Sequence, residues 1–299
     1  MGKRIIVIDV GGTNLRIASI QDGRLEAVRS FPSIASLPPP EGFKFLEERI
    51  REFAGEELQA VVLGFPGLIS KNGRLHHSPN LKGYEGIELR EGLLGLGVPI
   101  FVENDANLYA LGEGLKGAAR GKKNFCCLTL GTGVGSGVII EGKLLKGSEG
   151  VAAEIGHMTI KFDGAPCSCG SRGCLEAYCS GTAILRMARE EGLDVRTAKE
   201  VADLAMQGEA AALRVFERMG EYLGAGLANI VNIFNPEVIV IGGRVAEAFS
   251  LFIGRALEVM SKMAFSFARE GVRVLKASLG DEAALWGGLA LVEAQHEDQ

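Results

Sequence analysis

Four residues of types that bind zinc lie close together in the chain: His157, Cys167, Cys169 and Cys174. Three thiolates and one imidazole fill a tetrahedral Zn²⁺ ion and leave no position for a reactive water. We therefore interpret the cluster as a structural zinc site. The alternative is a group of reduced, buried cysteines, although the short C-x-C-x4-C spacing has no obvious packing reason.

An acidic residue and a glycine turn follow the first apolar run of the chain. Residues 4–9 read as a buried strand that ends at Asp9, and Gly11, Gly12, Thr13 and Asn14 come next. Backbone N–H groups in such a turn can surround phosphate oxygens, and glycine permits close approach. Asp9 would then hold a hydrated Mg²⁺ ion. An ordinary glycine turn is the alternative.

The same pattern recurs later in the chain. The predicted strand at 124–130 runs into Gly131, Thr132 and Gly133, and another strand follows. Such a recurrence predicts two similarly built halves, each presenting one phosphate-binding turn to a shared cleft. A further strand, at 237–241, ends in Gly242 and Gly243, which would let the flat adenine ring approach the backbone.

A carboxylate follows a third predicted strand, at 99–103. Asn104 and Asp105 stand where that strand meets a helix, which is where open α/β sheets bind ligands. Asp105 would act as general base on a substrate hydroxyl that attacks phosphorus. The alternative is that Asp105 only caps the helix.

Further polar residues would suit a polyol. Asn80 lies in a predicted loop at 76–83, although asparagine in loops is usually turn chemistry. Glu154 and Glu176 flank the zinc-type cluster on either side.

Composition limits the class of protein. The chain has 299 residues, 47% of them apolar, and 42 glycines, which predicts a two-domain α/β protein with many tight turns. A net charge of -5 argues against nucleic acid as the main partner. We expect a cytoplasmic protein without a membrane segment, because no apolar run approaches the ~20 residues of a membrane helix and no signal peptide is evident.

Further elements follow from periodicity and turn residues. We expect a β-hairpin around Asp22-Gly23, a stiff connector at 38–40 and a helix at 42–53. The remaining expected strands are 60–63, 138–141 and 273–277, and the remaining expected helices are 108–115, 182–191, 198–206, 210–234 and 281–293.

Taken together and in order, these stretches resemble the ROK family of sugar kinases and repressors, bacterial glucokinases in particular. The stretches that carry the resemblance are DVGGTNLR (9–16), PGLI (66–69), SPNLKGY (78–84), ENDANLYALGE (103–113), GTGVGSGVI (131–139), EIGH (154–157) and CSCGSRGCLEAY (167–178). The sequence departs from the family where Lys82 and Tyr84 replace Pro and Trp, and where Cys179 replaces Ala.

The resemblance implies two actin-like, ribonuclease H-like α/β domains of the hexokinase, Hsp70 and actin superfamily, with a cleft between them. One domain would comprise residues 1–118 and 281–299, and the other residues 119–280 with the zinc loop. It also implies a homodimer or homotetramer.

The resemblance further implies a role for each candidate residue. Asp105 would be the catalytic base. The sugar contacts would be Asn80, Asn104, Asp105, Glu154, His157 and Glu176. The ATP and Mg²⁺ sites would comprise Asp9, Gly11, Gly12, Thr13, Asn14, Gly131, Thr132, Gly133, Gly242 and Gly243.

The expected activity is ATP- and Mg²⁺-dependent phosphorylation of a hexose, glucose first, at its 6-hydroxyl. The alternative acceptors are N-acetylmannosamine and N-acetylglucosamine, and polyphosphate is a less favoured donor. A sugar-responsive repressor is disfavoured, because the predicted first strand begins at Arg4 and leaves no room ahead of it for a DNA-binding module. A catalytically inactive sensor is disfavoured because Asp9 and Asp105 are both present.

Overall fold

The chain, seen in a computed structural model that describes residues 4–55 and 57–297, forms two compact units. The first comprises Met1–Arg120, Leu144–Ala152 and Asp281–Gln299, and the second comprises Gly121–Lys143 and Ala153–Gly280. The limits of the two expected domains stay a prediction, because compactness alone does not show which segments fold independently.

The first unit is built on a mixed five-stranded sheet in the order β3-β2-β1-β4-β7. Its strands are β1 (Arg4–Val10), β2 (Asn14–Gln21), β3 (Arg24–Pro32), β4 (Leu58–Phe65) and β7 (Ile100–Asn104). Strands β1 to β3 form an antiparallel meander, and β4 and β7 run parallel to β1. The predicted hairpin between β2 and β3 is confirmed, since Asp22 and Gly23 have φ of 50° and 71°, as a tight primed turn requires.

The described part of the first unit contains three α-helices: α1 (Pro39–Ala54), α2 (Asp105–Leu115) and α9 (Ala283–Glu297). The predicted connector at 38–40 is wrong in part, because Pro39 and Pro40 form the first turn of α1, where a missing N–H costs nothing. The predicted loop at 76–83 is also partly regular. It contains the end of β6 (Leu75–His77), which pairs with β5 (Leu68–Ile69), and the start of a 3-10 turn, η2 (Lys82–Tyr84).

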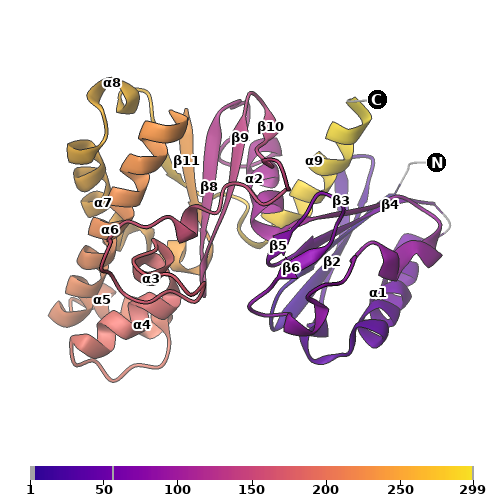
Figure 1. The fold of residues 1–299 in the computed structure, drawn as a ribbon, viewed down its shortest axis with the longest axis horizontal. Coiled ribbons are helices and arrows are strands. Elements are labelled where there is room, and N and C mark those ends of the chain that lie inside the picture. The colour runs from indigo at the N-terminus through magenta and orange to yellow at the C-terminus, as the bar shows by residue number, and fades with distance from the viewer. Residues whose placement is uncertain (1–3, 56, 298–299) are drawn as a thin grey trace. The chain divides into compact units, whose positions relative to one another are not determined.

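Helices α2 and α9 come from distant parts of the sequence and pack together through glycines. A Cβ atom on Gly112 would lie 1.9 Å from the carbonyl oxygen of Ala283, and one on Gly287 would lie 1.8 Å from that of Leu108. Figure 1 shows the yellow helix α9 beside the indigo strands of its own unit. The last helix thus packs beside the first sheet because glycines let the backbones of α2 and α9 come into contact.

The second unit repeats the architecture with the sheet order β10-β9-β8-β11-β12. Its strands are β8 (Phe125–Leu130), β9 (Val134–Ile140), β10 (Lys143–Leu144), β11 (Val238–Gly242) and β12 (Arg273–Lys276). Strand β9 is antiparallel to β8, whereas β11 and β12 run parallel to β8. The predicted recurrence of an α/β unit with a glycine turn after its first strand is therefore confirmed.

Among the residues that the structure describes, six α-helices belong to the second unit, on which Figure 1 labels them. They are α3 (Glu176–Cys179), α4 (Gly181–Glu190), α5 (Ala198–Met206), α6 (Ala210–Phe234), α7 (Phe249–Met263) and α8 (Ser266–Arg269). The periodicity predicted α4, α5 and α6 but not α3, α7 or α8. Across the described part of the chain, no helix combines the length and apolarity needed to cross a membrane.

The glycine contact between α2 and α9 predicts a large stability difference between two Gly→Ala substitutions. Gly287→Ala would force the helices apart, and we expect overpacking to cost about 1–3 kcal/mol. Gly254→Ala is the control, since Gly254 is exposed in α7 and a Cβ there meets nothing within 4 Å. Alanine in that helix should stabilise by about 1 kcal/mol. Urea midpoints measure both, and equal midpoints would contradict the packing.

Candidate functional site

The carboxyl ends of three parallel strands gather acidic and amide side chains in the first unit. Asp9 of β1 pairs with Gly64 of β4, and Gly64 pairs with Glu103 of β7. Asn104 and Asp105 follow Glu103 directly. The register therefore brings Asp9, Asn104 and Asp105 to one edge of the first sheet, where parallel sheets place their ligands.

Asp9 is held by an arginine that the sequence reasoning did not single out. Arg16 lies 3.0 Å from Asp9 Oδ2 through Nη2, and its Nη1 lies 3.1 Å from Asp281 Oδ2. Burial raises the pKa of Asp9, and the charge and hydrogen bond of Arg16 oppose that rise. Arg16 is the last residue of the motif at 9–16, and this position in the motif could have indicated a role beside Asp9. A buried carboxylate at a strand end, stabilised by one arginine, fits a residue that holds a hydrated cation.

The first glycine turn has its own backbone hydrogen bonds and lies against Asn80. Gly11 N donates to Asn14 O at 2.9 Å, and Ser33 N donates to Thr13 O at 2.9 Å. A Cβ on Gly12 would lie 3.0 Å from Asn80 Cγ, so only glycine leaves that amide in place. The structure thus brings the turn and Asn80 together.

Asn104, and not Asp105, caps helix α2. Asn104 Oδ1 accepts hydrogen bonds from Ala106 N at 2.9 Å and Asn107 N at 3.1 Å, and its Nδ2 donates to Gly67 O at 3.1 Å. Asp105 is the first helical residue, and its Oδ1 also accepts from Ala106 N at 2.9 Å. The interpretation of Asp105 as the helix cap is therefore wrong.

Glu103, which the sequence reasoning used only as a strand end, supports this corner. Its side chain is buried and forms an ion pair with Lys146 at 2.6 Å. Glu103 Oε1 also accepts a hydrogen bond from Asn107 Nδ2 at 2.9 Å. The buried carboxylate of Glu103 therefore holds the first turn of α2 in place.

The loop around Asn80 departs from the family at a core position. Tyr84 is fully buried, and its ring lies 5.7 Å from those of Phe43 and Phe65. Its hydroxyl donates to Ile34 O at 3.3 Å. Lys82 is exposed. The tyrosine therefore anchors the loop in the core.

A cavity of about 810 Å³ opens in the second unit beside the second glycine turn. Its walls include Gly131 and Thr132 of that turn and four residues that follow Gly242 and Gly243, namely Arg244, Val245, Glu247 and Ala248. Gly243 has φ 82°, and a Cβ there would lie 2.5 Å from Leu130 O. The two glycine segments thus adjoin each other at the ends of β8 and β11, and the cavity has the size of a small-ligand site.

The second glycine turn is held by residues at the start of α4. Gly181 N donates to Gly131 O at 2.7 Å, and Thr182 Oγ1 donates to Thr132 O at 2.9 Å. Within the turn, Gly131 N donates to Gly133 O at 2.9 Å. The backbone of this turn is therefore preorganised.

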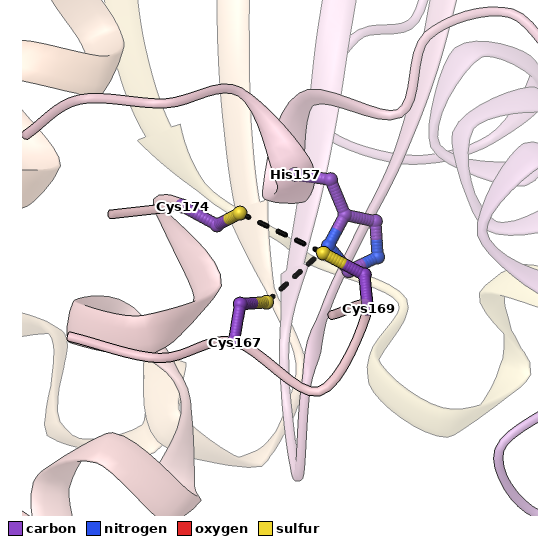
Figure 2. A group of neighbouring side chains, drawn as sticks. All are labelled: His157, Cys167, Cys169 and Cys174. Carbon is purple, nitrogen blue, oxygen red and sulfur yellow. Dashed lines mark hydrogen bonds between the residues drawn. The ribbon is translucent and has the colours of Figure 1, made fainter. Parts of the chain in front are cut away.

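The four zinc-type residues converge as predicted (Figure 2). Their ligand atoms all lie within 4.8 Å of one another. His157 Nδ1 lies 3.6 Å from Cys167 Sγ, and Cys169 Sγ lies 3.8 Å from Cys174 Sγ. Zn–S bonds of about 2.3 Å in a tetrahedron imply S–S edges close to ~3.8 Å. The donor set fits zinc, and since Cys169 is exposed, a group of buried cysteines does not describe it.

Glu154 and Glu176 lie near the cluster and near each other. Burial raises the pKa of Glu154, the charge of His157 opposes this, and the negative charge of Glu176 adds to it. Glu154 forms a tight turn in which Ile155 N donates to Ala153 O at 2.8 Å. Ala153 has φ 67°, a left-handed conformation that is costly for a residue with a side chain and that often occurs at functional sites. The second unit therefore brings together Glu154, His157 and Glu176.

The family model described as "ROK family" matches residues 5–295. The chain belongs to the ROK family. It is 33% identical to a glucokinase of Thermotoga maritima, with 97% of each chain covered, and 36% identical to a glucokinase of Halalkalibacterium halodurans, with 96% of this chain and 94% of the relative covered. It is also 36% identical to a xylose repressor of Bacillus spizizenii, over 76% of this chain and 59% of the repressor.

Solved structures of ROK proteins share the fold. A ROK family glucokinase from Streptomyces griseus, in complex with glucose and AMPPNP, has a TM-score of 0.81 at 32% identity and covers 96% of this chain and 98% of its own. A ROK hexokinase from Thermus thermophilus has a TM-score of 0.85 at 31% identity, with 99% and 100% covered. The predicted fold class is thereby confirmed for this ROK protein.

The zinc assignment predicts that metal removal exposes half of the thiols. Cys126, Cys127 and Cys179 are fully buried, and burial raises the pKa of Cys126 to about 12, so these thiols should stay inert. Cys174 is buried too, but it lies in the loop that the zinc ion would order. We expect roughly one zinc ion per chain, and a chelator should loosen this loop and make Cys167, Cys169 and Cys174 reactive toward Ellman's reagent. Reaction of all six cysteines in the folded, zinc-loaded protein would contradict the assignment.

Proposed function

We propose that this protein is an ATP-dependent hexose kinase of the glucokinase type that phosphorylates the sugar 6-hydroxyl. One observation carries the proposal. The cavity of the second unit is lined by Gly131 and Thr132, which the sequence predicts as a phosphate turn, and by residues that directly follow Gly242 and Gly243, which it predicts for the adenosine. The similarity to full-length glucokinases, one of them solved with glucose and AMPPNP, supports a sugar as the acceptor.

The residues of the first unit would act on the sugar hydroxyl and the transferred phosphoryl group. Asp105 would accept the hydroxyl proton through its carboxylate as the oxygen attacks phosphorus. Asn104 Nδ2 is already committed to Gly67 O, so Asn104 serves first to fix the start of α2 beside Asp105. The backbone of Gly11 to Asn14 would bind phosphate oxygens, with Asn80 beside it.

Magnesium would be held at Asp9, whose buried carboxylate Arg16 stabilises. A bound Mg²⁺ ion neutralises charge on the phosphate oxygens during transfer. Asp9 Oδ2 accepts a hydrogen bond from Arg16 Nη2, which orients the carboxylate.

The residues of the second unit would recognise the sugar and the nucleotide. Glu154, His157 and Glu176 offer fixed acceptors and a ring nitrogen to sugar hydroxyls. With Nδ1 of His157 turned toward the thiols, Nε2 is the nitrogen that would serve the sugar. The zinc-type cluster is then structural in its coordination and functional in what it orients. N-acetylmannosamine and N-acetylglucosamine remain the alternative acceptors, and polyphosphate the alternative donor.

The catalytic assignment of Asp105 has a direct kinetic consequence. Asp105→Asn should lower kcat by about 100 to 10,000-fold, the usual contribution of a general base. Sugar affinity should change little, because the amide can still hydrogen-bond a hydroxyl. Steady-state kinetics and titration calorimetry with glucose measure the two effects. The exposed Asp194, replaced by Asn, is the control and should leave both unchanged. Equal losses of rate and affinity would remove the general-base role.

The acceptor is identified by a coupled ADP-release assay with ATP and Mg²⁺. The panel is glucose, mannose, fructose, N-acetylglucosamine and N-acetylmannosamine, and we expect the highest kcat/KM for glucose. A higher kcat/KM for either N-acetylated sugar would establish the alternative acceptor class. No ADP release with any of these sugars would contradict the proposed activity.

A further inference from the structure

Glu176 connects two parts of the second unit that would bind different ligands. Its Oε2 accepts a hydrogen bond from Val134 N at 2.9 Å, directly after the glycine turn of residues 131–133. Its Oε1 accepts one from Ser168 Oγ at 2.6 Å, between the zinc-type ligands Cys167 and Cys169. One carboxylate therefore links the phosphate turn to the zinc loop, defined as residues 157–174.

The carboxylate of Glu176 packs tightly against the glycine turn. A Cβ on Gly133 would lie 2.5 Å from Glu176 Oε2, so the carboxylate lies directly against the turn. The backbone just before His157 lies against Val134, the residue that donates to Glu176, since a Cβ on Gly156 would lie 2.0 Å from Val134 O. Glu176 and Gly156, which both contact Val134, thus belong to the segments that carry the predicted sugar contacts.

Short elements connect this point to the rest of the turn. Glu176 begins the single turn of α3, and Ser180 and α4 follow at once. Gly181 and Thr182 at the start of α4 bind the carbonyl oxygens of Gly131 and Thr132. Glu176 therefore begins the short segment whose following residues hold the carbonyl oxygens of the turn, while its own carboxylate accepts from Val134 N.

We propose that Glu176, beside its predicted contact with the sugar, couples the two substrates, so that a nucleotide in the turn of residues 131–133 tightens sugar binding through Val134, Glu176 and Ser168. This inference rests on the proposed kinase function and deepens it. Coupling of this kind is reciprocal, so sugar must tighten nucleotide binding by the same factor.

The test measures the coupling factor, which is the ratio of the glucose dissociation constants without and with saturating Mg-AMPPNP, by titration calorimetry on the full, zinc-loaded chain. We expect a factor of at least about five in the unaltered protein, the low end of typical coupling. Ser168→Ala removes one arm of the link and no predicted sugar or nucleotide contact. It should bring the factor close to one, while zinc content and the melting temperature stay unchanged.

Thr182→Val is the matched control. It removes a hydrogen bond from the same turn and leaves both hydrogen bonds of Glu176 in place, so it should weaken nucleotide binding and keep the coupling factor. Glu176→Gln should abolish coupling, because an amide cannot accept both hydrogen bonds through two oxygens.

The outcomes separate this proposal from the kinase proposal. If glucose and Mg-AMPPNP both bind and Ser168→Ala leaves the coupling factor unchanged, the coupling role of Glu176 is overturned and the kinase function is not. Equal loss of coupling in Ser168→Ala and Thr182→Val would also overturn it, since general loosening of the turn would then suffice. Absence of binding by either ligand would overturn the kinase function and this inference with it.

Discussion

The convergence of four donor atoms at His157, Cys167, Cys169 and Cys174 is the constraint on which the candidate sugar site depends. The segment between them has little regular structure, with only isolated bridges such as Thr159 to Cys174 among the described residues. Such a segment loses much conformational entropy on ordering, and a metal that joins its ends can offset that loss. The position of His157 therefore depends on the ligands that flank it.

A second, metal-independent anchor holds the same loop. Tyr178 Oη accepts a hydrogen bond from Ala165 N at 2.7 Å, and its ring stacks on that of Tyr222 in α6 at 3.8 Å. Loss of zinc should consequently loosen the thiol end of the loop before it releases the whole segment. The loop is thus attached to the long helix by packing, and zinc would add a second attachment by coordination.

Both units use the same device at their first strands. A buried strand ends in a glycine turn, and a side chain from another segment lies against a glycine: Asn80 against Gly12, and Glu176 against Gly133. A Cβ at either position would displace the polar group. Close approach of backbone and side chain therefore explains why glycines, and not only flexible turns, recur there.

Much of this was readable from the chain itself, because the deciding interactions are local. Buried strands followed by glycine turns, and His and Cys at ligand spacing, predicted the paired α/β units and the convergence of the cluster. The sequence does not predict helix α3, because a single turn carries no periodicity, and it predicts a connector at Pro39 and Pro40, although proline also suits a first helical turn. Only the tertiary structure decided that Asn104 caps α2, that Arg16 pairs with Asp9 and Asp281, and that Glu176 joins Val134 to Ser168. These contacts form between residues that chain folding brings together, and neither spacing nor residue type specifies which donor reaches which acceptor.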